Sequence, residues 1–449
     1  MLDSLKPKFL RKDSSDEAAQ LLAERSFAHS DDEGHHDKYK MVYWVYFIYG
    51  IAMLLPWNVF ITASEYFAKR FASTPYEETF QNYFSTYFTI TNLFTFALIL
   101  FLQNKSVFSI NSFIPIFLNT LIFGILAVTV ETDIEGTGYF WFIMALIVLT
   151  GGTTSFFQNS VFSEASQLPP MYMQAVLSGQ GIAGVIVAVS SILSAIAANS
   201  DDVPDESTIS RSAFLYFLSA FIITAAALVG RLVVVKLPFY RRQMNIKTFV
   251  QEEIEELPVN QEPVKVLDVV RKSYSLIYTV GYIFIITLML FPSITSLIKS
   301  VKRNSIESGR FFDDDIFVAF HFLLFNVGDW VGRMMPISSY FQIFQTKYLV
   351  LLSTARTVFI PLFLVCNVIV SGERKLPVLI GNDVVYFFLI WIFAVTNGWI
   401  CSLAMMSAPQ LKTIKSGIEK SMVGSVMSFS LIVGLAIGGS LSFIARWMV

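Results

Sequence analysis

The stretch His321-Phe-Leu-Leu-Phe-Asn-Val-Gly-Asp-Trp-Val-Gly-Arg333 is apolar and long enough for a helix, yet it carries three strongly polar side chains. Asn326, Asp329 and Arg333 are spaced i, i+3 and i+7, so on a helix they share one face, and Asp329 and Arg333 can pair side by side. Ionisable groups at membrane depth are costly and usually mark a substrate or ion path. The spacing therefore predicts a solute site; a structural ion pair that locks two helices is the alternative.

The composition of the whole chain predicts a membrane protein around this stretch. Hydrophobic residues make up 54% of the 449 residues and charged residues 15%, with 43 Phe, whereas in soluble domains about 25% of residues are charged. Repeated apolar runs are long enough to cross about 30 Å of hydrocarbon. We expect an all-α polytopic membrane protein with eleven transmembrane helices, at about 41–63, 81–103, 108–130, 139–160, 173–198, 211–235, 273–298, 313–336, 347–370, 384–408 and 421–446.

Two polar intervals divide the chain into parts. The first forty residues are charged and polar, which predicts a disordered, solvated tail without a cleavable signal peptide. The longest polar interval after the tail separates six predicted spans from five. The sequence therefore predicts a tail over 1–40, a six-helix bundle over 41–235, a linker over 236–272 and a five-helix bundle over 273–449.

The distribution of Lys and Arg between the loops favours a cytosolic N-terminal tail and a cytosolic 236–272 linker. An odd number of spans then places the C-terminus on the opposite side. Within the tail, Glu17 followed by Leu21-Leu22 fits the acidic dileucine pattern that clathrin adaptors read. This predicts sorting to an endosomal, lysosomal or vacuolar membrane. A chance match is the alternative, with the plasma membrane as the location.

Other spans contain polar residues or helix breaks. Pro56 kinks the first span beside Trp57 and Asn58, which predicts a ring and an amide at one depth, although Trp57 could also be an interfacial anchor. Gln158 can donate and accept, which suits a planar heterocycle or a bond between helices. We expect Arg356 to clamp the two bundles together rather than bind a ligand.

Several classes of protein are excluded. The chain lacks a GxxxxGK[ST] phosphate loop, its four His and two Cys show no metal spacing, and no catalytic Ser/His/Asp set can be argued. Cys366 and Cys401 lie in apolar runs and are expected to be inert packing residues. The net charge of −2 gives no sign of a nucleic-acid partner. The sequence therefore predicts neither an enzyme nor a bound cofactor or metal.

Motifs spread along the chain resemble the equilibrative nucleoside transporter family when taken together. They are Pro56-Trp-Asn with Thr62-Ala and Tyr66-Phe, the region of Gln158, Ser178-Gly-Gln-Gly with Gly184, Phe325-Asn326 with Asp329 and Gly332-Arg333, and Arg356 with Pro361 and Cys366-Asn367. The resemblance covers nearly all of the membrane domain. It implies eleven spans, a cytosolic N-terminus and a major-facilitator-like fold of six plus five helices.

The resemblance also implies a nucleoside site and a gate. Asp329 and Arg333 would contact the ribose hydroxyls, and Asn326 would support them. Gln158 would meet the edge of the nucleobase, with Trp57 lining the cavity near the base and Leu54 on its wall. Ile61 against Pro292 would form part of an outer gate, although family members often carry Met where Ile61 stands.

The function that follows is facilitative transport of nucleosides across the bilayer by alternating access, with nucleobases as a further candidate cargo. An organic-cation or monoamine carrier of the same family is the first alternative, and it would need an anionic group free of a partner. A multi-span receptor is the second, and it would bind a ligand without net flux.

Overall fold

The computed structural model describes residues 36–72, 74–77, 79–103, 112–132, 134–197, 206–244, 264–303, 309–370 and 374–449. Within these ranges the protein is all-α, and eleven helices are long and apolar enough to cross a membrane. Each overlaps one of the predicted spans, so the all-α class and the eleven spans are confirmed. Glu17, Leu21 and Leu22 lie outside the described residues.

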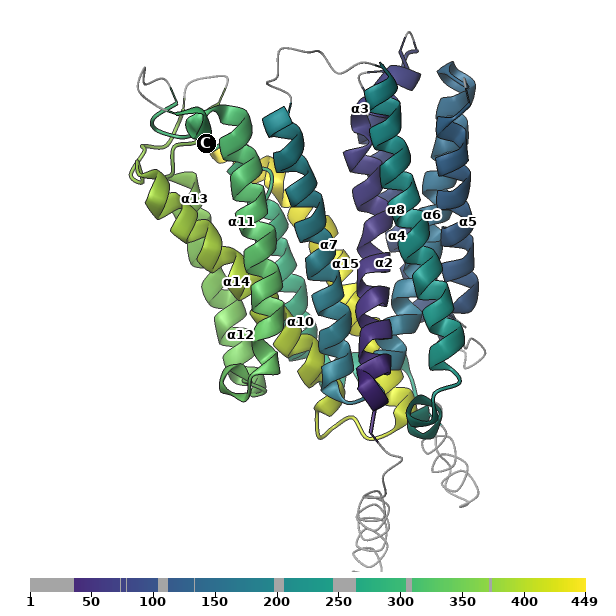
Figure 1. The fold of residues 1–449 in the computed structure, drawn as a ribbon. Coiled ribbons are helices and arrows are strands. Elements are labelled where there is room, and N and C mark those ends of the chain that lie inside the picture. The colour runs from purple at the N-terminus through teal and green to yellow at the C-terminus, as the bar shows by residue number, and fades with distance from the viewer. Residues whose placement is uncertain are drawn as a thin grey trace, which may run out of the picture.

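The helices that precede the central interval pack mainly on one another (Figure 1). Helix α2 contacts α7 and α8, α5 contacts α6 and α8, and α4 contacts α6, while the short α3 continues α2 after a break at Ala63. Their bounds are α2 (Met41–Thr62), α3 (Ser64–Arg70), α4 (Phe80–Gln103), α5 (Phe113–Val130), α6 (Gly136–Ala165), α7 (Pro170–Ala197) and α8 (Glu206–Val234). We call these helices the N-terminal group.

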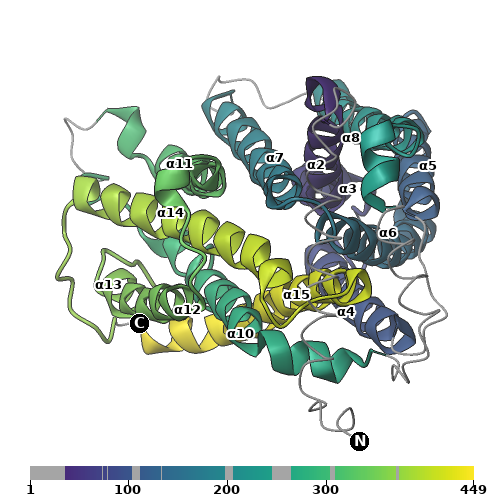
Figure 2. The same ribbon diagram turned by 90° about the horizontal axis from the view of Figure 1, so that it is seen from below.

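The later helices form a second group, in which α10 packs on α15, α12 and α14, and α11 packs on α14. Their bounds are α10 (Val266–Leu290), α11 (Asp314–Met334), α12 (Thr346–Ala355), α13 (Phe359–Leu364), α14 (Asp383–Ser407) and α15 (Gly417–Met448). We call these the C-terminal group. Figure 2 shows α7 between α2 and α11, and α7 with α11 and α6 with α15 make the main contacts between the groups.

Some helix boundaries differ from the expectation. Helix α10 begins at Val266, inside the interval predicted to be a linker, because the helix continues past the apolar run through Arg271 and Lys272. The ninth span is α12, a 3-10 turn and α13, and it ends at Leu364 rather than near 370. The chain beyond it leaves the helix and forms isolated bridges to Ile298 and Ile380. The division of the chain into a tail, two bundles and a linker stays a prediction.

Glycines set how closely the helices approach. A Cβ on Gly50 would lie 2.0 Å from the carbonyl oxygen of Val176, and one on Gly179 would lie 2.0 Å from that of Phe47. Since real Cβ atoms do not approach backbone oxygens so closely, α2 and α7 need glycine where they meet. Gly332 and Gly398 bring α11 and α14 together in the same way.

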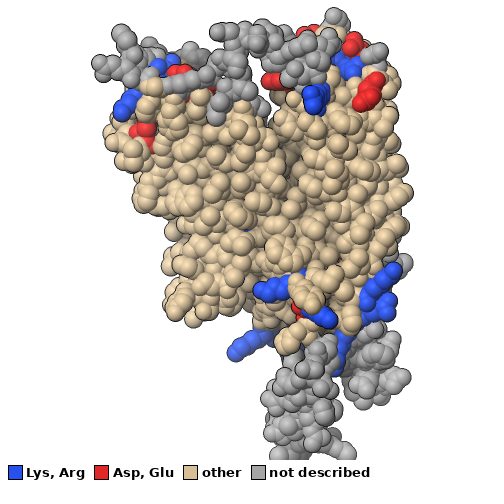
Figure 3. Space-filling model, viewed as in Figure 1, with Lys and Arg blue, Asp and Glu red and all other residues tan. Residues whose placement is uncertain are grey.

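Charged side chains gather at the two ends of the helices. Figure 3 shows Lys, Arg, Asp and Glu at both ends, with an uncharged band between them. We call the end where α2 begins and α11 ends the lower end, as in Figure 1, and the opposite one the upper end. Charged residues buried between these ends are therefore exceptional, and they define the site described next.

Candidate functional site

Asp329 and Arg333 form an ion pair near the lower end of α11. Nε of Arg333 donates to Oδ2 of Asp329 over 2.7 Å, as their i, i+4 spacing predicts. The side chains are 11% and 8% exposed, so both charges are largely withdrawn from solvent and lipid. In a buried ion pair, the remaining N–H groups and carboxylate lone pairs also need hydrogen-bond partners. These further partners show which helices the pair joins.

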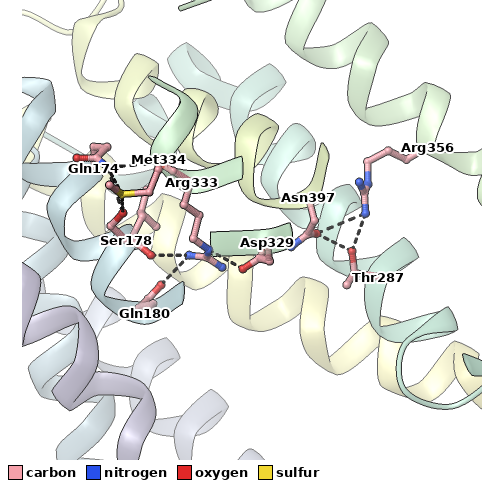
Figure 4. A network of polar contacts seen from close by, with 10 residues as sticks. Gln174, Ser178, Gln180, Thr287, Asp329, Arg333, Met334, Arg356 and Asn397 are labelled. Atoms are coloured by element: carbon pink, nitrogen blue, oxygen red, sulfur yellow. Dashed lines mark hydrogen bonds and ion pairs between the residues drawn. The ribbon is translucent and has the colours of Figure 1, made fainter. Parts of the chain in front are cut away.

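Arg333 joins α11 to α7 of the N-terminal group (Figure 4). Its Nη1 donates to the carbonyl oxygen of Leu177 over 3.2 Å and to Oε1 of Gln180 over 3.3 Å. In return, Nε2 of Gln174 donates to the carbonyl oxygen of Arg333 over 3.3 Å. The guanidinium therefore bonds to both helix groups, so a relative movement of the groups would change its contacts.

Asp329 has a second partner to which the sequence analysis assigned no role. Nδ2 of Asn397 on α14 donates to Oδ1 of Asp329 over 2.6 Å. Asn397 accepts at Oδ1 from Thr287 of α10 over 2.7 Å and from Nη2 of Arg356 over 3.5 Å. The network in Figure 4 thus continues from the ion pair on α11 to α14, α10 and Arg356, all in the C-terminal group.

The expectation that Arg356 clamps the two bundles together is wrong. Its guanidinium is buried at 2% exposure and donates to Phe393 and Thr396 of α14 and to Thr287 of α10. These partners belong to the C-terminal group. Arg356 therefore holds α10 and α14 together beside the break between α12 and α13.

The predicted residues of α2 follow one face of the helix. Leu54 and Trp57 are half-buried and Ile61 is 50% exposed, in a helix whose other faces are packed. The ring of Trp57 stacks on Phe88 of α4, with 4.8 Å between centroids. Beside it, Nδ2 of Asn58 is buried without a hydrogen-bond partner. This face has the mixed character expected of a cavity wall.

Gln158 and Asn326 lie where the helix groups meet. Gln158 is 8% exposed, and its Nε2 donates to Oγ of Ser428 on α15 over 3.0 Å. Nδ2 of Asn326 donates to the carbonyl oxygen of Phe322, while its Oδ1 lies 2.4 Å from where a Cβ on Gly184 would stand. Asn326 thus faces α7 rather than extending the network around Asp329.

Several further polar contacts between the groups lie toward the lower end. Besides those of Arg333, Ser178 donates to Sδ of Met334 over 2.6 Å, Gln103 donates to Ser425 over 3.2 Å, and the hydroxyls of Ser163 and Ser421 meet. Toward the upper end, the two residues predicted to form a gate, Ile61 and Pro292, are both exposed. Polar contacts therefore join the two groups at Gln158, at Arg333 and toward the lower end.

A second buried ion pair lies within the N-terminal group. Oε2 of Glu164 accepts from Arg231 over 2.8 Å, from Tyr240 over 3.0 Å and from Tyr46 over 3.2 Å, and Oε1 accepts from Ser112 over 3.1 Å. Burial and the Glu164 carboxylate raise the pKa of the Tyr240 phenol, so it stays a donor. The cluster ties α2, α6, α8 and the helical residues 238–244 together at the lower end.

Comparison with known proteins gives a consistent family match. A family model described as "Nucleoside transporter" matches residues 143–447. Human equilibrative nucleoside transporter 1 is 29% identical, covering 92% of this chain and 98% of its own length. Mouse equilibrative nucleoside transporter 2 is 28% identical, covering 91% of this chain and 98% of its own length. Arabidopsis thaliana equilibrative nucleotide transporter 1 is also 28% identical, covering 92% of this chain and 87% of its own length.

Among solved structures, the major facilitator superfamily transporter FucP in its outward conformation matches with a TM-score of 0.45 and 14% identity over 92% of this chain and 98% of its own. The human organic anion transporter MFSD10 matches with a TM-score of 0.48 and 13% identity over 91% and 94%.

Proposed function

Because this chain belongs to the nucleoside transporter family, a family of transporters and not of enzymes, we propose that it is a facilitative carrier of nucleosides that works by alternating access. The observation that supports this most strongly is the buried Asp329–Arg333 pair, which lies where the two helix groups meet. Nucleobases stay a further candidate cargo.

In the proposed site, Asp329 accepts from the hydroxyls of the ribose and Arg333 donates to them, since a carboxylate and a guanidinium together suit a vicinal diol. Asn326 supports this pair from the same helix. Gln158 meets the edge of the base, and Leu54 and Trp57 line the cavity wall. Gln158 and Asn326 both lie at the junction between the helix groups, as these roles require.

The lower contacts suggest how the carrier changes state. The carbonyl of Leu177 and the amide of Gln180 hold Arg333 against α7. To open the site toward the lower end, the helix groups must break these bonds and those between Ser178 and Met334. The exposure of Ile61 and Pro292 fits a state whose upper gate is open. Closing that gate would bury the two residues against each other.

The orientation and compartment are proposals of the same kind. The Lys and Arg bias favours the cytosol for the lower end, the N-terminal tail and the central linker. We propose an endosomal, lysosomal or vacuolar membrane, reached through clathrin adaptors that read Glu17, Leu21 and Leu22. The plasma membrane is the alternative.

The contacts of Asp329 do not favour an organic-cation carrier. Such a carrier would need a carboxylate free to pair with the substrate, whereas Oδ2 of Asp329 accepts from Arg333 and Oδ1 accepts from Asn397. With Arg356 close to Asn397, the network holds two guanidinium groups for one carboxylate. Its net positive charge would disfavour a monoamine.

Uptake into cells that lack endogenous nucleoside transport tests the proposal. Wild type, Asp329→Ala and Arg333→Ala are expressed, and uptake of labelled uridine and adenosine is divided by the amount of protein at the membrane. We expect saturable uptake by the wild type and a loss of at least about tenfold in each variant, since each substitution leaves a buried charge unpaired. Unchanged uptake in both variants would refute the site assignment.

A further inference from the structure

We propose that Asn397 is a positioning residue for Asp329, oriented by Thr287 and Arg356, and that it makes the site selective for a sugar with two free neighbouring hydroxyls. This inference rests on the proposed function, because it names which part of a nucleoside the carboxylate recognises. It starts from the 2.6 Å bond between Nδ2 of Asn397 and Oδ1 of Asp329.

The orientation of the Asn397 amide is determined by its surroundings. The hydroxyl of Thr287 lies 2.7 Å from Oδ1 of Asn397, and Nη2 of Arg356 lies 3.5 Å from the same atom. Since the Asp329 carboxylate can only accept, the NH2 group of Asn397 faces it, and Oδ1 faces Arg356 and the hydroxyl of Thr287, which also lies 2.8 Å from the carbonyl oxygen of Ile283. Asn397 is 2% exposed, so bulk water does not compete for these positions.

Arg356 is held firmly enough to serve as the anchor of this arrangement. Its Nη1 donates to the carbonyl oxygen of Phe393 over 2.8 Å and to the hydroxyl of Thr396, and its Nη2 donates to Thr287 over 3.1 Å. Its guanidinium carbon lies 4.5 Å from the centre of the Phe393 ring. These contacts join α10 and α14, so a change in the distance between the two helices would shift the Asn397 amide.

The consequence for Asp329 is a fixed carboxylate with defined free positions. Its Oδ2 is held by Arg333 and its Oδ1 by Asn397, so neither oxygen can rotate away without losing a bond. A carboxylate offers about four acceptor positions. With one position used on each oxygen, each keeps one for a ligand. Oδ1 and Oδ2 can therefore accept from two neighbouring hydroxyls, such as those on carbons 2 and 3 of ribose.

The test compares a ribonucleoside with its 2′,3′-dideoxy form in vesicles reconstituted with purified full-length protein. Of uridine and adenosine, the one that the wild type takes up faster is used. For Asn397→Ala, we expect KM for the ribonucleoside to rise about tenfold, since a hydrogen bond to a charged group is lost. KM for the dideoxynucleoside should stay within about twofold, because this substrate lacks the hydroxyls that the carboxylate recognises.

Further variants separate positioning from packing. Thr287→Val keeps the side-chain shape and should raise KM for the ribonucleoside about threefold, in the same selective way. If Asn397→Ala does not fold, the Thr287→Val variant alone tests the positioning role of Asn397. Arg374→Gln is the matched control, because Arg374 also donates to backbone carbonyls, those of Leu364 and Cys366, away from the site.

The possible results distinguish two failures. If wild type takes up neither nucleoside, the proposed function itself is wrong. If wild type transports the ribonucleoside but Asn397→Ala and Thr287→Val change both KM values by the same factor, or lower only the maximal rate, Asn397 merely stabilises the fold. Either of these last outcomes would overturn the positioning role.

Discussion

The carbonyl oxygen of Asp329 lies 2.0 Å from the point where a Cβ on Gly398 would stand. Helices α11 and α14 therefore touch backbone to backbone at the residue that carries the proposed ribose-binding carboxylate. The adjacent Asn397 reaches Asp329 because no side chain separates the helices there. The closeness of the two helices and the geometry of the site thus have the same cause.

Gly398→Ala should damage the site although it changes none of the polar side chains in it. The added methyl group must push α14 away from α11, which costs about 1–3 kcal/mol and lengthens the bond from Asn397 to Asp329. We expect nucleoside uptake per folded molecule to fall about tenfold. Gly439→Ala on α15 is the control, because a Cβ there meets nothing within 4 Å. Equal uptake by the two variants would contradict this account.

The Glu164–Arg231 pair should support stability rather than transport. Removing one partner leaves a buried charge, so Arg231→Met should lower the free energy of unfolding by about 3 kcal/mol. Adding Glu164→Gln should restore part of this loss. The thermal midpoint of purified protein in detergent measures both effects. Glu164 would instead belong to the transport cycle if Glu164→Gln, well folded, changed the rate of uptake per molecule.

Accessibility to thiol reagents should differ between the two ends of the molecule. Ile61→Cys at the upper end should react quickly with a polar maleimide, because Ile61 is 50% exposed. Ser178→Cys should react slowly, since Ser178 is fully buried where α7 meets Met334. The natural cysteines Cys366 and Cys401 are buried and should contribute little background. Added nucleoside should slow the labelling of Ile61→Cys; equal rates at both positions would contradict a structure closed at its lower end.

The sorting prediction is independent of the membrane helices. A tagged protein with Leu21→Ala and Leu22→Ala should move from internal membranes to the cell surface if clathrin adaptors read this motif. Fluorescence microscopy with a lysosomal or vacuolar marker measures the change. Ala18→Ser and Ala19→Ser, within the same motif at positions that the pattern leaves free, form the control. An unchanged distribution in the dileucine variant would remove the motif from the account.

The sequence was sufficient to predict the parts of the structure that depend on local spacing. Apolar runs are long enough to identify all eleven spans, and the i, i+4 spacing of Asp329 and Arg333 predicts their pairing. The same spacing could not show that Arg333 also contacts Leu177, because that contact depends on how α7 and α11 pack.

The roles of Asn397 and Arg356 illustrate the limit of sequence reasoning. The two residues are far from Asp329 along the chain, and only the packing of α10, α11 and α14 brings them together. A charged residue in an apolar span marked Arg356 as unusual, but that signal does not identify a partner. This is why Arg356 was expected between the bundles and instead lies within one group of helices.

Equilibrium exchange in proteoliposomes tests the central claim most directly. Purified wild-type protein is reconstituted, unlabelled nucleoside is placed at equal concentration on both sides, and a trace of labelled nucleoside is added outside. A facilitative carrier predicts saturable entry of label that needs no ion gradient, and this entry should be lost in Asp329→Asn. Label that enters no faster than into protein-free liposomes, or as fast with Asp329→Asn as with wild type, would contradict a nucleoside carrier built around this carboxylate.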